Sequence, residues 1–517
     1  MPLPRSWPHG TSERFRVCMP SGSRRTSLIP NRSNALSPVS TLSFGNGKAN
    51  AIQTRPQGQL NSAAADITAN EPELDRRFMM FYFDHFFPFL FPFYAPPLLD
   101  GGRWWIMELV VSNLSMWHTT LSLSTYFVSV VLDGAASERN LCKTLAWEKL
   151  IKQMSETYSA LQLSLQDLSS CTMKEVIVKT GRVMGSIVQL QRFEIASGNL
   201  EHCREHLDAA VELFRRVFQC AAVSNGSHVE HVTLEDVLIH MGLPLWALNS
   251  QHRRAWGSNQ AAIRFYAALL IVDDIVASAC TGQAPQLLEY HTRLLANNSG
   301  PDDTARLHLA DFTGCETWVM LQISEMAVLE TWKKSMKRAG QLDTMELAAR
   351  ASVIKQALLE NIASLKQRSS SSRIDRLSCF DIYKAQSAQM GVSRTFVTCV
   401  WAYGAGLYLS IVVSGWQPKS LTIRSGVMQV LAYLEQIPAP ELLRTMVWPF
   451  CIAGCLAQPG EEDRFRALAD ALVPNLFGGA RKALEIMENV WRSRNELNFD
   501  TDLASCIRSL GYVPLLA

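Results

Sequence analysis

The stretch FVTCVWAYGAGLYLSIVVSGW, from Phe396 to Trp416, decides whether this chain is a membrane protein or a large helical domain. It contains no charged residue and is long enough for a helix to cross the hydrocarbon layer of a bilayer. Small and polar residues such as Gly404, Gly406 and Ser410 interrupt it, and the sequence offers neither a second clean span nor Lys/Arg-flanked loops. A helix that is apolar on all sides is also typical of the centre of a large domain. We therefore predict a buried core helix, with a membrane span as the alternative.

The composition is typical of a globular intracellular protein and excludes several other classes. The 517 residues are 48% hydrophobic and 19% charged, which is enough to bury one large or two ordinary domains. The 49 basic and 47 acidic residues nearly balance, so the whole chain offers no general electrostatic attraction to nucleic acid. Its 12 cysteines are scattered, and only Cys451 and Cys455 are close together, which excludes a secreted disulfide scaffold and a zinc ribbon.

Residues 1–70 are predicted to form a disordered basic tail. The segment is rich in Ser, Pro, Asn and Gly, and its apolar residues are too sparse to offset the entropy of ordering the chain. Up to Ala65 it carries eight basic residues against Glu13 alone. Such a tail is typical of a solvated linker, of an arm that contacts phosphates or directs nuclear import, or of a mitochondrial transit segment. Prolines at positions 2, 4, 8 and 20 disfavour the amphipathic helix that a transit segment needs.

Residues 71–517 are predicted to form one all-α domain. Its first segment, FMMFYFDHFFPFLFPFY from Phe78 to Tyr94, should be a short helix to about Phe87, followed by an extended stretch set by prolines. The apolar stretch Trp105 to Leu132 contains a few polar interruptions and predicts a pair of core helices.

Helical periodicity continues through the rest of the chain. Apolar residues recur at the spacing of one helix face in segments 141–164, 175–194, 200–218, 234–247, 261–279, 315–336 and 344–366. Alternating runs of β-branched residues between turn signals are scarce, so we expect no sheet of consequence. The polar bridge 297–303 and the serine run 368–373 are predicted to be loops, and neither marks a domain boundary.

The sequence HCREH, from His202 to His206, has the H-x-x-E-H spacing of an inverted zinc-peptidase helix. Two histidines four positions apart on a helix can share one metal ion. However, the apolar stripe of this segment runs through Cys203 and Leu207, and at about 100° per residue Glu205 lies nearly opposite that stripe. The motif should therefore face solvent, no third ligand follows it, and we predict no metal site.

Asp273 and Asp274, in LLIVDDIVASA, are similar to the aspartate-rich motif with which class I terpenoid synthases hold magnesium on a diphosphate. That motif needs a further acid at its fifth position, where this chain has Ala277, and no second magnesium motif is present. A polar contact pair in a buried helix is the simpler interpretation. Cys451 and Cys455 are expected to pack in the core. Since phosphate loops and a G-x-S-x-G elbow are also absent, we predict no catalytic, cofactor-binding or metal-binding residue.

The sequence VWPFCIAGCLA, from Val447 to Ala457, resembles the late signature of the fungal-specific transcription factor domain in its second subtype. This domain is the regulatory region of zinc binuclear-cluster (Zn2Cys6) regulators. Further segments resemble the same family: Phe83 to Tyr94, the turn GGRWW at Gly101 to Trp105, AGLYLSIVVSG at Ala405 to Gly415, Trp491 with Arg492 and Arg494, Asp502, and the closing LGYVPLLA. The resemblance spans Phe78 to Ala517 and implies a soluble all-α domain in which Phe396 to Trp416 is a core helix.

The resemblance implies a nuclear transcription regulator and no enzyme activity, controlling metabolic, secondary-metabolite or developmental genes. The family's DNA-binding module needs six closely spaced cysteines that hold two zinc ions. Before Cys142 this chain has only Cys18, so we expect it to reach DNA indirectly or through a missing N-terminal module. A homodimer or a heterodimer with a zinc-cluster regulator, and a small-molecule effector, are the expected partners, without a cofactor or a membrane. An all-α enzyme of the terpenoid synthase type is the alternative function.

Overall fold

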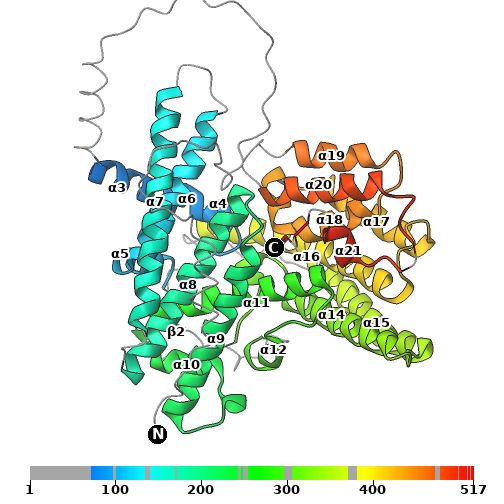
Figure 1. The fold of residues 1–517 in the computed structure, drawn as a ribbon, viewed down its shortest axis with the longest axis horizontal. Helices are drawn as coiled ribbons and strands as arrows, with labels where there is room; N and C mark the ends of the chain where they lie inside the picture. The colour runs from blue at the N-terminus through cyan, green and yellow to red at the C-terminus, as the bar shows by residue number, and fades with distance from the viewer. Residues whose placement is uncertain are drawn as a thin grey trace, which may run out of the picture.

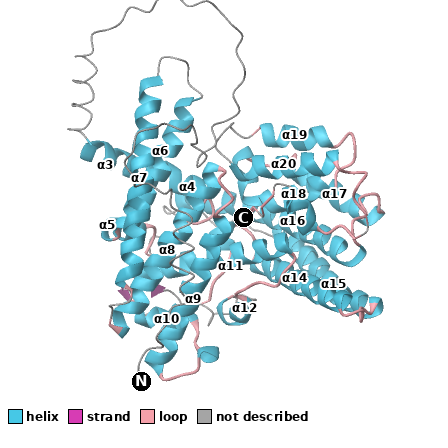
Figure 2. Ribbon diagram, viewed as in Figure 1, coloured by secondary structure: helices cyan, strands magenta, loops and turns pink. Residues whose placement is uncertain are grey.

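The computed structural model describes most of the chain from Glu71 onward. The described residues are 71–96, 101–133, 140–168, 172–242, 246–247, 254–295, 306–370, 381–471, 478–498, 500–508, 511–512 and 514–516. The predicted tail 1–70 and the predicted loop 297–303 lie outside them. Within the described residues the secondary structure is helical apart from one pair of two-residue strands (Figure 2), which confirms the predicted all-α class.

Helix α16, Asp381–Ser414, contains nearly all of the uncharged stretch that begins at Phe396. Among the described residues, its segment Ser393–Ser414 is the one helix long and apolar enough to cross a membrane, and 72% of its most apolar part is buried inside the fold. It packs against α14, α15, α17 and α18. Gly415, with a φ of 74°, ends it through the left-handed conformation that glycine adopts without strain. This helix lies in the core of the fold, as predicted.

The aromatic segment after Glu71 is helical further than the sequence analysis predicts. Helix α3 (Glu71–Phe81), a π-helical turn (Tyr82–Phe86) and α4 (Phe87–Leu90) follow one another without a break. The predicted end near Phe87 is therefore wrong. Pro88 lies in the first turn of α4, where its missing N–H removes no hydrogen bond of that helix.

The next apolar stretch forms the predicted helix pair, α5 (Trp104–Ser112) and α6 (Leu114–Asp133). Asn113 separates the two helices with an extended backbone. Its side-chain oxygen accepts a hydrogen bond from the backbone N–H of Ser115 at 3.1 Å, which satisfies a donor that the first turn of α6 would otherwise leave without a partner.

The remaining helices include the predicted segments between residues 141 and 366, and further helices that were not predicted. They are α7 (Asn140–Asp167), α8 (Met173–Ser197), α9 (Cys203–Asn225), the 3-10 turn η4 (Val229–His231), α10 (Leu234–His240), α11 (Ser258–Thr281), α12 (Leu288–Leu294), α13 (Ala310–Thr313), α14 (Thr317–Arg338), α15 (Thr344–Ser370), α17 (Leu421–Leu434), the 3-10 segment η5 (Pro440–Met446), α18 (Val447–Cys455), α19 (Glu462–Asp470), α20 (Gly478–Arg492) and α21 (Leu503–Ile507).

Two boundaries differ from the prediction. The helix expected over 234–247 ends at His240, and Trp246–Ala247 instead forms strand β1, paired antiparallel with β2 (Arg254–Ala255). Gly242 follows that helix with a φ of 122°, which an α-helix cannot accommodate. The serine run from position 368 is helical as far as Ser370, because serine in a helix costs only a fraction of a kcal/mol relative to alanine, on the order of 0.5.

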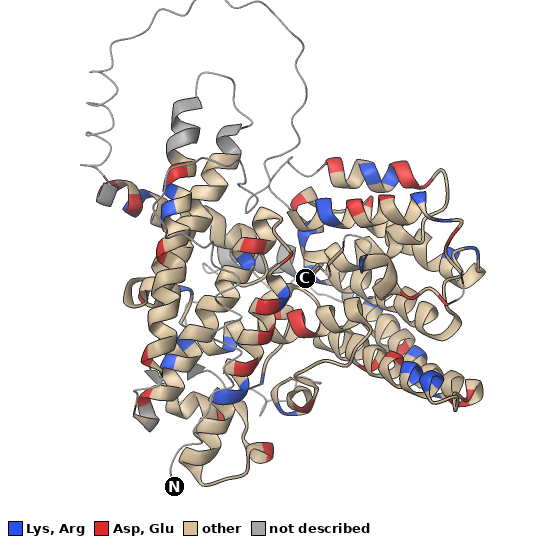
Figure 3. Ribbon diagram, in the orientation of Figure 1, with Lys and Arg blue, Asp and Glu red and all other residues tan. Residues whose placement is uncertain are grey.

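The helices form two groups that meet along α11 (Figure 1). Helices α6 to α10 lie in one group, and α14 to α20 lie in the other. Helix α11 is buried along nearly its whole length and packs against α8 and α9 of the first group and α14 of the second. Residues of both charge signs occur along outer helices such as α15 and α19 (Figure 3).

Candidate functional site

A cavity of about 120 Å³ lies where the two helix groups meet. One side comes from the aromatic segment around α4 and from α6, α8 and α11, and the other from α14, α16, η5, α18 and α20. Leu515 and Leu516, near the C-terminal end of the chain, also line it. Three segments that resemble the family therefore line the same cavity. They are the aromatic segment at the beginning of the domain, the late signature and the closing residues.

The first wall of the cavity is aromatic. The rings of Phe89 and of Phe127 in α6 lie 5.4 Å apart between centroids, edge to face. The backbone carbonyl of Phe93 accepts a hydrogen bond from Arg394 in α16 at 3.2 Å. Gly314 lies so close to Phe93 that a Cβ would come within 2.4 Å of the ring, so this contact requires glycine. Both helix groups therefore fix the position of the aromatic wall.

The GGRWW turn holds the end of this aromatic segment. Gly101 and Gly102 both have positive φ, at 102° and 59°. The turn lets Arg103 donate two hydrogen bonds to the carbonyl of Tyr94, at 3.1 and 2.7 Å. The indole N–H of Trp105 donates to the Tyr94 hydroxyl at 2.9 Å. These buried and half-buried contacts explain why a double glycine followed by Arg and Trp is needed here.

The opposite wall joins α16 to α18. Trp401 is stacked on Trp448 with 5.5 Å between ring centroids, and its indole N–H donates to the carbonyl of Thr445 at 2.9 Å. Farther along α16, Gly404 lies against Pro449, and a Cβ at this glycine would come within 2.5 Å of the proline Cβ. The two helices are thus packed at a separation that only glycine allows.

An ion pair lines the cavity on the side of the first helix group. Arg192 in α8 contacts Asp273 in α11, with one guanidinium nitrogen 2.6 Å from each carboxylate oxygen. Burial raises the pKa of Asp273, and the contact with Arg192 limits that rise. The Nε of Arg192 is buried and has no hydrogen-bond partner among the described residues.

Arg444 in η5 is the second basic residue of the lining. Its guanidinium lies over the ring of Phe89, 4.3 Å from the centroid, and donates a hydrogen bond to the carbonyl of Glu441 at 2.6 Å. Burial lowers the pKa of Arg444 to about 9, with a smaller opposing effect from the charge of Glu441.

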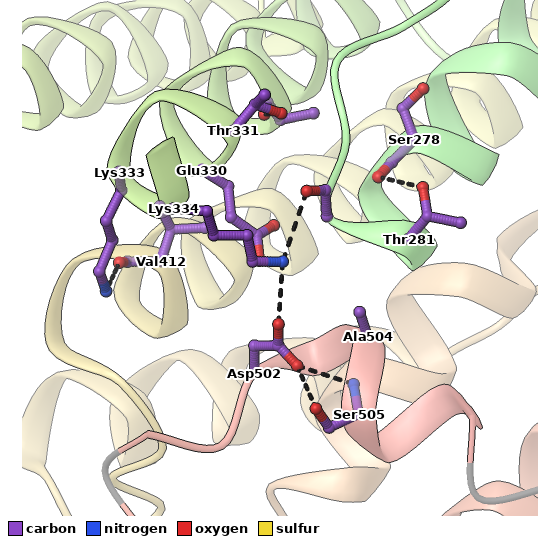
Figure 4. Close-up of polar contacts among 12 residues, drawn as sticks. Ser278, Thr281, Glu330, Thr331, Lys333, Lys334, Val412, Asp502, Ala504 and Ser505 are labelled. Atoms are coloured by element: carbon purple, nitrogen blue, oxygen red, sulfur yellow. Dashed lines mark hydrogen bonds and ion pairs between the residues drawn. The ribbon is translucent and has the colours of Figure 1, made fainter. Parts of the chain in front are cut away.

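A polar network holds α21 against α14 (Figure 4). The Nζ of Lys334 lies 2.8 Å from a carboxylate oxygen of Glu330 and 2.8 Å from one of Asp502. Asp502 is also the N-cap of α21 and accepts a hydrogen bond from the backbone N–H of Ser505 at 2.8 Å. Since the residues after α21 line the cavity, this network helps to position that wall.

Residues 77–512 match the fungal specific transcription factor domain. The chain belongs to this family. It is a transcription regulator of fungal type, and the resemblance seen in its sequence is confirmed. No solved structure matches the chain.

Three curated relatives are all named as transcription regulators. Transcription factor dibT of Pestalotiopsis microspora is 34% identical over 447 residues, which are 84% of this chain and 70% of the relative. Pestheic acid cluster transcriptional regulator 3 of Pestalotiopsis fici is 25% identical and covers 94% of this chain and 83% of the relative. Trichothecene biosynthesis transcription regulator TRI10 of Trichoderma arundinaceum is 25% identical over 81% of this chain and 92% of the relative.

The HCREH motif of the regulator lies on the first turns of α9, away from the cavity lining. His202 and Glu205 are partly exposed, as predicted. His206 is not, since only 1% of it is exposed, and the prediction that the motif faces solvent is wrong for this residue. It belongs to the row that continues through Ala210 and Leu213, which the helix buries against the core. In the described part of the chain, no group of three potential metal-ligating side chains surrounds a common point.

The paired aspartates of the regulator make contacts between segments, as predicted. Asp273 binds Arg192, and Asp274 accepts hydrogen bonds from the backbone N–H groups of Gln286 at 3.1 Å and Leu287 at 2.8 Å. Burial raises the pKa of Asp274 to about 6. Cys451 and Cys455 are buried in the core, which confirms their predicted packing role.

Neither arginine of the cavity could be identified from the sequence. Arg192 lies in an ordinary amphipathic helix, and nothing in its neighbourhood along the chain distinguishes it from a surface arginine. Arg444 lies just before the VWPFCIAGCLA signature. The signature therefore draws attention to this region but does not predict that Arg444 is buried. Only the packing of η5 against the aromatic segment places it at the cavity.

Proposed function

We propose that this regulator acts in the nucleus and controls the genes of a secondary-metabolite biosynthetic cluster. The observation that carries the proposal is the naming of two relatives as regulators of the pestheic acid cluster and of trichothecene biosynthesis. In both, the aligned region covers more than four fifths of this chain, so the likeness includes most of the described domain. The helical domain would act as the regulatory and effector part.

DNA would be reached through a partner that carries a zinc binuclear cluster, or through an N-terminal module of the same kind. The sequence supports this route, because Cys18 is the only cysteine before Cys142. Eight basic residues in the first 65 supply at most a weak, salt-sensitive and sequence-independent attraction. A homodimer or a heterodimer with a zinc-cluster regulator would then present the domain at promoters, and a small-molecule effector would set its activity.

Deletion of the gene in its host tests this function. Transcripts of neighbouring biosynthetic genes should change together by several-fold, return on complementation, and leave unlinked genes unaffected. A fluorescently tagged, complementing protein should accumulate in nuclei. Unchanged cluster transcripts, or a tagged protein confined to mitochondria or membranes, would contradict the proposal.

Two assays on the purified chain of 517 residues test the route to DNA. In a gel-shift experiment near physiological salt the chain alone should give only diffuse binding that disappears as salt rises and after deletion of residues 1–65. It should co-purify with a zinc-cluster relative from its host, and the pair should bind a defined promoter site. A sequence-specific footprint by the chain alone at high salt would show that the partner is unnecessary.

The proposal includes the absence of enzyme activity. The contacts of Asp273 with Arg192 and of Asp274 with the 286–287 backbone support it, because both carboxylates already have protein partners. Incubation with magnesium and a prenyl diphosphate should release no diphosphate. Release that is lost in Asp273→Asn would favour the terpenoid synthase alternative instead. Recovery without detergent is expected as well, since the apolar helix α16 is mostly buried by its neighbours.

A further inference from the structure

A groove of about 550 Å³ runs along α16 between α15 and α17, and it shares no lining residue with the cavity described above. Its lining extends from Ala348 to Ile362 on α15 and from Ala402 to Ser414 on α16. At about 1.5 Å per residue, these stretches are about 21 and 18 Å long. The groove therefore has the length of a helix of about 12–15 residues.

The floor of the groove is made of small side chains on α16. Ala402, Gly406, Ser410 and Ser414 recur at every fourth position, which places them in one row along the helix. The nearest atom to a Cβ at Gly406 would be a methyl carbon of Leu358, at 3.7 Å, so the space above this glycine is open. The Ser410 hydroxyl donates to the carbonyl of Gly406 at 2.9 Å and has its partner within its own helix. Another helix can therefore approach α16 closely along this row.

The wall on α15 is apolar and partly open to solvent. Ala351, Leu358 and Ile362 are buried, whereas Leu359 in the same wall is 52% exposed. A drug-sized molecule usually buries about 70–90% of its surface, which an open groove does not provide. An amphipathic helix suits this shape better, because only its apolar face needs cover while its polar face stays in water.

The charges at the groove are basic. Lys355 is the one charged side chain among the described lining residues, and Lys419 lies next to the lining residue Ser420. Both lysines are exposed, and neither forms a hydrogen bond or ion pair with another described residue. Lys366 donates a hydrogen bond to the hydroxyl of Tyr403, which also lines the groove, at 2.9 Å. These positive charges favour an occupant whose polar face is acidic.

The acidic residues of α15 do not cancel this charge inside the groove. Glu346 and Glu360 are the two glutamates of this helix, and both lie outside the lining. Glu346 pairs with Arg350 at 2.6 Å, and Glu360 accepts a hydrogen bond from Gln356 at 2.7 Å. A second copy of the chain is therefore a poor occupant, because a twofold axis would place two identical basic grooves against each other.

We propose that the groove between α15 and α17 binds an amphipathic helix of another protein, with the apolar face of that helix on Gly406 and Leu359 and an acidic outer face near Lys355 and Lys419. The binding is independent of the proposed function. That the bound protein takes part in transcription rests on the proposed function.

Fluorescence anisotropy with three labelled peptides of 15 residues tests the binding to the purified chain of 517 residues near physiological salt. The first peptide has leucines along one helix face and glutamates on the other. The second has lysine in place of each glutamate, and the third has the composition of the first with its leucines spread around the helix. The first should bind at one site, about tenfold or more tighter than the others, because it alone matches both the apolar floor and the lysines.

The third peptide also controls for the basic tail. It has the same charge as the first, so attraction by the eight basic residues before Ala65 affects both peptides alike. Absence of saturable binding by the first peptide, or equal binding of all three, would overturn the proposal.

Two substitutions on α15 locate the site. Leu359→Glu should weaken the first peptide about tenfold or more, because it replaces an apolar contact with a carboxylate that repels the peptide. Val353→Glu is the matched control, since Val353 is also apolar and is 71% exposed on the same helix but lies outside the lining. It should bind like the unaltered chain. A Leu359→Glu protein that binds normally, or a Val353→Glu protein that loses the peptide, would place the site elsewhere.

Two further variants keep the test decisive if Leu359→Glu does not fold. Lys355→Glu changes an exposed side chain and should reduce the preference for the first peptide over the second by about threefold or more. Gly406→Leu adds bulk to the open floor without changing the charge, so it should weaken the first peptide about tenfold or more. Unchanged preference in one variant or unchanged affinity in the other would contradict the proposed position.

Sedimentation equilibrium of the unaltered chain separates a foreign helix from a second copy. A dimer that Leu359→Glu dissociates and Val353→Glu does not would show that a second copy fills the groove, and it would overturn the proposal. A monomer, or a dimer that both substitutions leave intact, is the expected result. Failure of peptide binding would leave the transcriptional function untouched, since the gene deletion measures that function without any added peptide.

Discussion

The Nζ of Lys334 lies 2.8 Å from a carboxylate oxygen of Asp502, which joins α14 to the N-cap of α21 (Figure 4). Burial alone would raise the pKa of Asp502, but hydrogen bonds from Lys334 and Ser505 outweigh it and hold the pKa below its usual value. A lowered carboxyl pKa stabilises the folded state above the unfolded pKa of about 3.9, and that stabilisation is lost as pH falls through the folded pKa.

Asp502→Asn should therefore destabilise the domain by about 1–2 kcal/mol at pH 7, although asparagine is itself a good N-cap. It should also make the loss of stability below about pH 4 shallower. Urea unfolding at pH 7 and pH 3.5 measures both effects. The control is Asp500→Asn, because Asp500 pairs with Lys337 at 2.5 Å on the surface and its loss should not be measurable. Equal effects of the two substitutions would show that the α21 contact is not special.

Two glycines of α16 should respond in opposite ways to alanine. At Gly404 a new Cβ would come within 2.5 Å of the Cβ and 3.1 Å of the Cα of Pro449, whose ring and backbone cannot yield easily. Gly404→Ala should cost about 1–3 kcal/mol through overpacking. At Gly406 the nearest atom is 3.7 Å away, which is an ordinary contact, so Gly406→Ala should be neutral or stabilise by up to about 1 kcal/mol through helix propensity. Thermal unfolding of both variants measures the difference, and a destabilised Gly406→Ala would contradict this account.

These glycines show what the sequence could and could not predict. A helix that is apolar on all sides could be predicted from Phe396 onward, because the residue types and their spacing indicate both helix and burial. Gly404 lies against Pro449, whereas Gly406 has only one neighbouring atom, at 3.7 Å from the position that a Cβ would take. This difference depends on how α18 crosses α16. The sequence around either glycine does not predict how these two helices cross.

The same limit applies to the cavity. The aromatic segment and the VWPFCIAGCLA signature were recognised separately, but their meeting at Arg444 and Phe89 is a tertiary fact. His206 differs for another reason: the apolar stripe through Cys203 and Leu207 predicts a narrow buried face, whereas α9 buries a wider face that includes His206. The prolines after Phe87 predict an extended stretch, but Pro88 lies in the first turn of α4, where a proline is tolerated.

The burial of His206 predicts a stability that depends on pH. Burial lowers the pKa of His206 to about 4, below the unfolded value of about 6.5. As pH falls from about 6.5 toward 4, His206 becomes protonated in the unfolded chain but stays neutral in the folded chain. The free energy of unfolding therefore decreases by up to roughly 3 kcal/mol. His206→Gln cannot titrate and should show a shallower decline than the unaltered chain in urea unfolding at pH 7, 6 and 5.

His228→Gln is the control for this experiment, because His228 is exposed and lies beyond the end of α9 that is far from His206. This variant keeps His206 and should therefore decline like the unaltered chain. Glu194, whose pKa burial raises to about 7, acts in the opposite direction but is present in all three proteins. Identical pH profiles for the two variants would show that His206 does not titrate as its burial requires. Metal analysis of the same preparations should find no stoichiometric zinc.

The pair of Arg192 and Asp273 predicts a non-additive pair of substitutions. Removing either partner leaves a buried charge without its counter-ion, so Arg192→Met and Asp273→Leu should each cost about 3–5 kcal/mol. Their combination replaces the pair by apolar side chains and should be much less destabilising than either alone. Asp274→Asn is a milder comparison, since an amide oxygen can still accept from the backbone N–H of Leu287. Urea unfolding of the unaltered chain, the two single variants at Arg192 and Asp273, and the double variant measures the coupling free energy. Additive losses in the double variant would mean that the two side chains stabilise the domain independently.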